Sequence, residues 1–172
     1  MAETTDRLFI EFSAEKLEQM AGRIAACLDK LSYEQVWLRH SENENAVGNL
    51  VLHLCGNLRQ WIGTGVAGKP DVRVRDREFA ARGDIQVGEL KERLAGAAED
   101  AAGIIRGVTA ERLTERVTVQ GYEKSVLEVI YHVVEHFCGH AGQIIFATKL
   151  ATGEDMGFYR HLGKAAHAEK TP

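Results

Sequence analysis

Apolar side chains recur at intervals of three and four residues through most of the chain, the spacing that gives a helix one buried face. Four stretches show it: residues 5–31, a second stretch that ends near residues 63–65, residues 87–107 and residues 123–151. Ser41 or Asn45 can cap the second stretch, and its glycines followed by Lys69 and Pro70 end it. Strand-like alternation is nearly absent, although RVTVQ at residues 116–120 could be briefly extended. The pattern predicts an all-α fold, a bundle of four helices.

A polar stretch, DVRVRDREFAARGD at residues 71–84, separates the second and third predicted helices. It is near the length at which an unstructured connection usually has a function, such as covering a pocket or docking a partner. A solvated crossover between helices is an equally good interpretation, so the sequence leaves both open.

Length and composition agree with one domain over residues 1–172. The chain has 172 residues, 45% of them hydrophobic and 27% charged, which allows a sizeable core. Its formal net charge is −4 and its basic residues alternate with acids, so we expect no nucleic acid partner. The first residues, MAETTDR, lack the pattern of a signal peptide, and no stretch approaches the roughly 20 apolar residues of a membrane span. We therefore expect a cytoplasmic protein that has no membrane partner.

Three cysteines, Cys27, Cys55 and Cys138, have no paired spacing, which argues against a disulfide framework and fits a reducing compartment. We interpret all three as small buried hydrophobic residues.

Histidines recur every four residues on the last predicted helix, in IYHVVEHFCGHAGQ, at His132, His136 and His140. Neighbours at this spacing lie on one helix face with Cβ atoms ~5–6 Å apart, so two of them can bind a common ion. Projection at about 100° per residue places several apolar side chains on the same side as His136, so this face looks into the core.

A further histidine, His53 in NLVLHLCGNLRQW, lies on the inward face of the second predicted helix. With helix axes ~8–10 Å apart, it can meet two imidazoles of the last helix. Several imidazoles in an apolar interior cost desolvation energy, which metal coordination offsets. We therefore predict that His53, His136 and His140 bind one divalent metal ion, with His132 in the pocket wall or beside the ligands. His40, His161 and His167 are in polar or terminal surroundings and receive no role.

Two other kinds of metal site are excluded by residue identity. A zincin needs glutamate directly after its first histidine, where this chain has Phe137. A di-iron bundle needs paired Glu-x-x-His motifs, but Tyr131 follows Glu128 at that spacing and Cys138 follows Glu135.

These motifs resemble those of the DinB-like superfamily of bacterial metal-binding four-helix bundles, which includes the bacillithiol and mycothiol S-transferases. EHFCGHAGQI on the last helix, NLVLHLCGNLRQWI on the second, Asn45, Asn49 and RDREF carry the resemblance, which is to an uncharacterised branch and covers nearly the whole chain. It implies ligands at His53, His136 and His140. It also implies an up-down-down-up bundle, often dimeric, that binds zinc, nickel or another divalent ion such as iron or manganese.

Three neutral imidazoles leave a coordination position open, so the site can accept a small-molecule substrate. We expect a thiol S-transferase that acts on a low-molecular-weight thiol, with a metal-dependent hydrolase or a non-enzymatic metal-binding bundle as alternatives. Asn57 and Gln143 can orient ligands or contact substrate, or merely fill core space. Arg59, Arg75 and Arg77 can receive a substrate carboxylate or remain solvated.

A homodimer is also expected, as the resemblance implies, and a second apolar stripe on the far side of the last helix could form its interface or that of another interaction. The stripe can equally belong to the core, and it consists of Leu127, Val134, Ala141 and Ile145.

Overall fold

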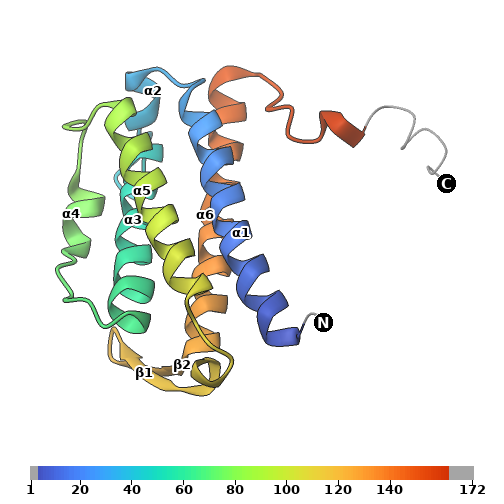
Figure 1. Cartoon of the computed structure of the whole chain (residues 1–172). Coiled ribbons are helices and arrows are strands. Elements are labelled where there is room, and N and C mark those ends of the chain that lie inside the picture. Colours follow the sequence, from blue (N-terminus) through green and yellow to red (C-terminus); the bar gives the residue numbers. More distant parts are fainter. Residues whose placement is uncertain (1–3, 163–172) are drawn as a thin grey trace.

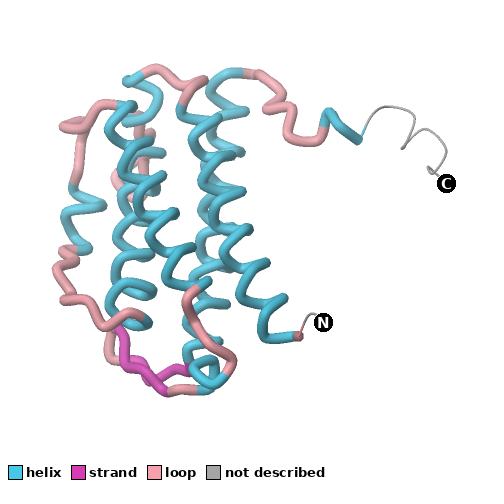
Figure 2. The backbone as a smooth tube through the Cα atoms, viewed as in Figure 1, coloured by secondary structure: helices cyan, strands magenta, loops and turns pink. Residues whose placement is uncertain are grey.

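The computed structural model describes residues 4–162, in which four long helices lie side by side (Figure 1). They are α1 (Thr5–Leu28), α3 (Val47–Leu58), α5 (Val87–Arg106) and α6 (Val126–Thr152). Shorter helices are α2 (Tyr33–Trp37) and α4 (Arg75–Ala80), with turns of 3₁₀-helix at η2 (Glu111–Thr114) and η3 (Arg160–Leu162). A two-stranded hairpin, β1 (Arg116–Val119) and β2 (Tyr122–Ser125), covers one end of the bundle (Figure 2). The predicted all-α bundle is confirmed.

The helices follow an up-down-down-up course: α1 and α6 run in one direction, and α3 and α5 run in the other (Figure 1). Each of α1 and α3 packs against both α5 and α6. Because α3 and α5 are parallel, residues 67–86, the crossover segment, must return along the whole bundle before α5 begins. The predicted connection is therefore a crossover, but it contains the helix α4. Six helical residues are too few to show a period in the sequence.

The core lies between the four long helices and is apolar along most of its length. Of the stripe considered for a dimer interface, Ala141 is buried, Val134 and Ile145 pack against the core, and Leu127 is 41% exposed. The core interpretation therefore accounts for three of its four members. The largest buried side chains include Leu17, Ile24, Leu54, Leu58, Leu94, Ile105, Ile130 and Phe137.

Helix α6 begins at a capping box. Ser125 Oγ accepts a hydrogen bond from the Glu128 backbone N–H, and Glu128 Oε2 accepts one from the Ser125 backbone N–H at 2.7 Å. The two bonds satisfy donors that the first turn leaves free. They also fix where α6 starts.

Helix α3 starts one residue later than expected, with Ala46 at its N-cap, so neither Ser41 nor Asn45 caps it. The side chain that caps the start of α3 is instead Asn49, a residue inside the helix. Its Oδ1 accepts a hydrogen bond from the Ala46 backbone N–H at 3.1 Å. The Asn49 Nδ2 group donates to the carbonyls of Glu78 and Ala81, at 2.9 and 3.0 Å. This buried amide therefore ties the crossover segment to α3.

The expected extended stretch is the first strand of the hairpin. Gln120 and Gly121 join the strands, with φ of 52° and 79°. Two left-handed residues in succession make the type I′ turn that suits the twist of a two-residue hairpin. The ring of Tyr122, which follows the turn, stacks on Trp61 with centroids 6.5 Å apart.

No helix in the described part of the chain is long and apolar enough to cross a membrane.

Candidate metal centre

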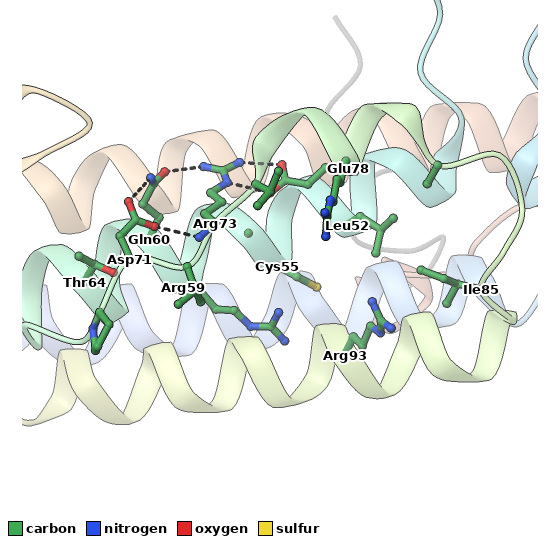
Figure 3. A pocket seen from close by; sticks show the side chains of 16 residues that line it. Leu52, Cys55, Arg59, Gln60, Thr64, Asp71, Arg73, Glu78, Ile85 and Arg93 are labelled. Carbon is green, nitrogen blue, oxygen red and sulfur yellow. Dashed lines mark hydrogen bonds and ion pairs between the residues drawn. The ribbon is translucent and has the colours of Figure 1, made fainter.

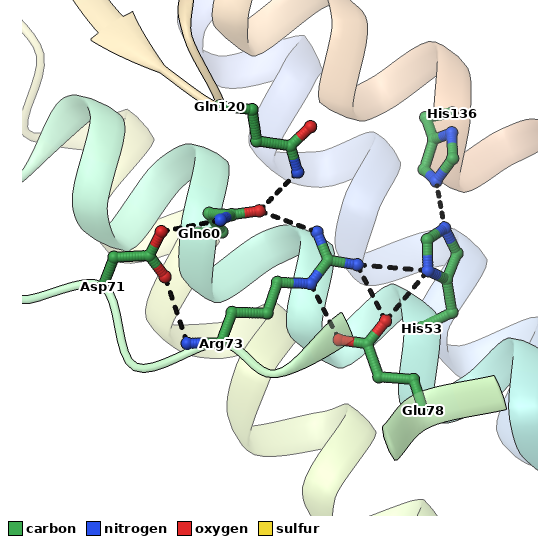
Figure 4. Close-up of polar contacts among 7 residues, drawn as sticks. All are labelled: His53, Gln60, Asp71, Arg73, Glu78, Gln120 and His136. Atoms are coloured by element: carbon green, nitrogen blue, oxygen red, sulfur yellow. Dashed lines mark hydrogen bonds and ion pairs between the residues drawn. The ribbon is translucent and has the colours of Figure 1, made fainter. Parts of the chain in front are cut away.

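Three imidazoles from two helices converge inside the bundle: His53 from α3, and His136 and His140 from successive turns of α6. One nitrogen of each lies within 4.8 Å of the other two, and we call this group the histidine cluster. The His53 ring centroid is 5.1 Å from each of the others, and the His136 and His140 centroids are 4.5 Å apart. His53 Nε2 and His136 Nε2 are 2.9 Å apart (Figure 4).

The donor set fits a single divalent ion. Imidazole nitrogens bind zinc at ~2.0–2.1 Å, which places neighbouring ligand nitrogens of a tetrahedral site roughly 3.3 Å apart. The observed separations, from 2.9 Å up to less than 4.8 Å, bracket that value. A small adjustment of the rings would therefore accommodate an ion.

On the side of His53 that faces away from the cluster, its Nδ1–H donates a hydrogen bond to Glu78 Oε2 at 3.0 Å. A ring with a proton on Nδ1 has its lone pair on Nε2, directed at the other imidazoles. Arg73 Nη2 also lies 3.1 Å from His53 Nδ1, but two donors cannot bond each other, so this contact only reflects the shared carboxylate. The Glu78 side chain thus sets the tautomer in which His53 can bind a metal.

Glu78 is itself held by Arg73, whose Nε and Nη2 reach its two oxygens at 2.7 and 2.8 Å (Figure 4). Both side chains are buried, with 4% of Arg73 and 10% of Glu78 exposed. Burial raises the pKa of Glu78, but hydrogen bonds from Arg73 and His53 outweigh it and leave the pKa below its usual value. The carboxylate is therefore ionised at neutral pH.

Arg73 is fixed in turn by Gln60, whose Oε1 accepts from Arg73 Nη1 at 2.9 Å. Gln60 Nε2 donates to Asp71 Oδ2 at 2.6 Å, and Gln120 of the hairpin turn also donates to Gln60 Oε1. A continuous chain of polar contacts therefore runs from Asp71 to the histidine cluster (Figure 4). Two segments of the crossover and the hairpin turn are joined to α3 in this way.

On α6, His140 Nδ1 lies 2.7 Å from Gln143 Oε1. An amide oxygen accepts, so Nδ1 is the protonated nitrogen and Nε2 has the lone pair, as in His53. Gln143 therefore orients one of the predicted ligands.

Burial lowers the pKa of His136 to about 4, and repulsion from His140, His53 and His132 adds to the effect. Burial likewise lowers the pKa of His140, against a smaller opposing effect of Gln143. Both imidazoles are therefore neutral at physiological pH, which is the form that binds metal.

His53 and His136 line a pocket of about 630 Å³, the histidine pocket, which also contains Asn57. One wall is aromatic: the His132 ring lies 4.3 Å from that of Trp61 and 5.7 Å from that of His136. His132 is thus placed beside the cluster, in the pocket wall. The rim is charged, with Arg75, Lys124, Glu128 and Glu135 among its residues.

Trp61 and Gln60 belong to a π-helix, η1 (Arg59–Val66), that continues α3. A π-helix is rare, is wider than an α-helix and is frequently found at functional sites. Here it places Trp61 against His132 and Gln60 against Arg73. The sequence gives no sign of the change in winding.

The three arginines expected to bind substrate line two different pockets. Arg75 lines the histidine pocket and lies over the Phe79 ring, 4.9 Å from its centroid. Arg59 and Arg77 line a different pocket, between α3, the crossover segment and α5. Of the histidines given no role, His40 is exposed and contacts Glu44, while His167 lies outside the described residues.

Sequence reasoning gave no role to Arg73 or Glu78, although Glu78 belongs to RDREF, one of the motifs that carry the resemblance. A signal was present in Gly56, an interior helical glycine less than one turn after His53. Such a glycine is unfavourable in a helix and indicates close approach of another segment. A Cβ atom at Gly56 would lie 1.9 Å from Glu78 Oε1 and 2.9 Å from Arg73 Nε.

Two solved structures share the fold. A conserved protein from Enterococcus faecalis aligns with a TM-score of 0.70 at 15% identity, covering 89% of this chain and 100% of that one. A DinB-like protein from Bacillus subtilis aligns with a TM-score of 0.65 at 14% identity, covering 86% and 96%. No curated protein matches the chain. The expected DinB-like fold is thus confirmed.

The comparison with protein families gives a match over residues 4–160, nearly the whole chain, to a family of proteins of unknown function. This chain has an up-down-down-up bundle and a three-histidine group that could bind a metal ion. The chain belongs to the DUF1572 family.

Proposed function

We propose that the protein is a divalent-metal-dependent enzyme in which His53, His136 and His140 bind one ion and the histidine pocket receives a small-molecule substrate. The observation that carries the proposal is the orientation of the imidazoles. Glu78 and Gln143 accept hydrogen bonds from the Nδ1–H groups of His53 and His140, which leaves the Nε2 lone pairs of both rings for an ion. The pocket of about 630 Å³ beside two of the three rings provides room for a guest.

Three neutral imidazoles are suited to zinc and nickel, and iron and manganese are the next candidates. When bound, such an ion keeps an open coordination position and stabilises an anionic form of the ligand there, either a thiolate or a hydroxide.

Thiol S-transfer is the reaction that the pocket supports best. Among the described residues that line it, none is a cysteine, serine or threonine, so no protein thiol or hydroxyl of these types competes with a substrate thiol as the nucleophile. Cys55 is not a substitute, because it lines the other pocket and burial raises its pKa to about 11. A low-molecular-weight thiol would supply the nucleophile without any covalent intermediate on the protein.

The residues of the pocket would bind and orient the two substrates. Arg75 and Lys124 at the rim can receive an acidic group, and Glu135 an amino group. Trp61 and Tyr122 offer flat surfaces to an apolar electrophile. Asn57, buried and on the same face of α3 as His53, can hydrogen-bond a substrate.

The test is conjugation of L-cysteine to monochlorobimane by protein whose metal content has been measured by elemental analysis. We expect about one ion per chain and conjugation that chelation abolishes and zinc or nickel restores. His140→Ala should lose both the ion and the activity, whereas His161→Ala should lose neither. Turnover of p-nitrophenyl acetate without conjugation would favour the hydrolase, and a metal-dependent rise in melting temperature alone would favour a non-enzymatic role.

The homodimer remains a prediction. Leu127 on α6 is 41% exposed, and the exposed apolar residues Tyr131, Phe146 and Leu150 lie on the same helix. Light scattering on the purified protein tests it, since a monomer at high concentration would exclude it.

A further inference from the structure

A second pocket lies beneath the crossover segment, on the side of α3 that faces α5 (Figure 3). We call it the crossover pocket; its volume is about 290 Å³. It is separated from the histidine pocket by the ion pair of Arg73 and Glu78, and Arg73 contributes to both linings. The function proposed above makes no use of it.

Three further guanidinium groups reach this pocket from three different elements. Arg59 comes from η1, Arg77 from α4 and Arg93 from α5. Long basic side chains on a surface normally spread into solvent or pair with acids. Here all three residues are exposed, yet each contributes to the lining of one cavity in a chain whose formal net charge is −4, so the positive charge is local.

The acidic residues of the lining do not neutralise these groups. Glu78 is engaged by Arg73 and His53, and Asp71 accepts from Gln60 and from the Arg73 backbone N–H at 3.1 Å. Arg93 contacts Glu89 of its own helix at 3.0 Å. Within residues 4–162, neither Arg59 nor Arg77 has an acidic partner. The pocket lining therefore has more positive than negative charge, and the N–H donors of Arg59 and Arg77 are not paired with a carboxylate of the described residues.

Apolar side chains form the rest of the walls. Leu52 of α3 and Ile85 of the crossover contribute to the lining, and Val72 and Val74 contribute as well despite being 82% and 52% exposed. Exposed valines beside a cavity are available to cover an apolar group. Charged donors next to an apolar wall suit a ligand that has an anionic head and a small apolar body.

We propose that the crossover pocket binds a small organic oxyanion, a phosphate or carboxylate. Arg59, Arg77 and Arg93 receive the anionic head, and Leu52 and Ile85 contact the apolar body. Guanidinium groups bind both kinds of head through paired N–H donors, so the chemistry of recognition is shared.

Calorimetric titration of the full chain after EDTA treatment tests this, with phenyl phosphate, benzoate, inorganic phosphate and benzyl alcohol as probes. Chelation matters because an anion could otherwise bind a metal in the histidine cluster. We expect saturable binding of phenyl phosphate or benzoate with a dissociation constant below about 1 mM. Inorganic phosphate should bind about tenfold more weakly, and benzyl alcohol should not bind. The stronger of the two aromatic anions identifies the preferred head.

Variants locate the binding. Arg59→Gln and Arg93→Gln should each weaken it about tenfold, as the loss of a charge-assisted hydrogen bond does. Arg160→Gln, the same change at a residue whose side chain is 77% exposed near the end of the described chain, should leave it unchanged. His140→Ala should also retain it, which separates this pocket from the histidine cluster even if the metal proposal fails. Equal affinity in the Arg59→Gln, Arg93→Gln double variant and the wild type, or no saturable binding of either aromatic anion, overturns the proposal.

Discussion

Glu78 accepts a hydrogen bond from His53 Nδ1 at 3.0 Å, although 25 residues and a reversal of chain direction separate them. The crossover segment therefore does more than connect two parallel helices. It places the buried Glu78 carboxylate beside His53 Nδ1, on the opposite side of the ring from the other two imidazoles of the cluster. A histidine paired with a carboxylate in this way is both oriented and made a better metal ligand.

Replacing Glu78 by Gln should lower metal affinity about 10–100-fold, the usual effect of removing such a partner. The amide keeps the shape of the side chain but loses the charge that holds the Nδ1 proton of His53 and balances Arg73. Competition with a chromophoric chelator measures the change. Glu44→Gln is the matched control, since Glu44 contacts the Nδ1 atom of the exposed His40 at 3.1 Å. Equal losses in both variants would contradict a specific role for Glu78.

Replacing Gly56 by Ala should both destabilise the protein and weaken metal binding. The new Cβ would lie 1.9 Å from Glu78 Oε1, so the Arg73–Glu78 pair must move away from α3. Overpacking of this kind typically costs about 1–3 kcal/mol, which exceeds the gain of up to about 1 kcal/mol from alanine's better helix propensity. Chemical denaturation and chelator competition report the two effects.

Gly96→Ala on α5 is the control for that experiment, because a Cβ there would have nothing within 4 Å. It should stabilise the protein by roughly 0.5–1 kcal/mol and leave metal binding unchanged. If Gly56→Ala behaves like Gly96→Ala, the crossover segment is not held against α3 as described.

The metal-free protein should lose stability as the pH falls from about 6.5 toward 4. The pKa of His136 is lowered to about 4 in the folded state, chiefly by burial and then by its neighbouring imidazoles, whereas its ordinary value is 6.5. Between these values the unfolded chain binds more protons than the folded one, so stability decreases with falling pH. Lowering of the His140 pKa by burial acts with the same sign. Urea denaturation of EDTA-treated protein at pH 7.5, 6 and 5 measures the trend.

His136→Gln should flatten that pH dependence, because the group that resists protonation in the folded state has gone. A wild-type protein equally stable at pH 7.5 and 5 would falsify the prediction. So would an unchanged slope in the variant.

The sequence sufficed for the parts of this molecule that depend on local periodicity. Spacings of three and four predicted the four long helices, and the repeat of His132, His136 and His140 placed imidazoles on one face of α6. His53 could be assigned to an inward position because the apolar residues around it follow a single helical period. These features are set within one helix and need no knowledge of its neighbours.

The features that the sequence did not reveal depend on how the crossover segment packs against α3. Glu78 reaches His53 only because α3 and α5 are parallel, which forces the crossover segment to run back along α3. Arg59 and Arg77 line the crossover pocket whereas Arg75 lines the histidine pocket, a distinction between like residues that composition cannot make. The start of α3 was misplaced for a related reason, since the side chain that caps it, Asn49, is inside the helix.

Ser125→Ala should cost roughly 0.5–2 kcal/mol of stability, as loss of an N-cap does, and should leave metal affinity unchanged. The capping box satisfies two donors at the first turn of α6, whereas His136 lies three turns further on, where the backbone bonds are already complete. Ser32→Ala removes the same kind of box from α2, a helix of five residues, and should cost less because fewer residues depend on it. Thermal melts and chelator competition on both variants separate stability from binding. A fall in metal affinity for Ser125→Ala that matched its loss of stability would mean that the position of the histidines depends on the helix start, and not on Glu78 and Gln143.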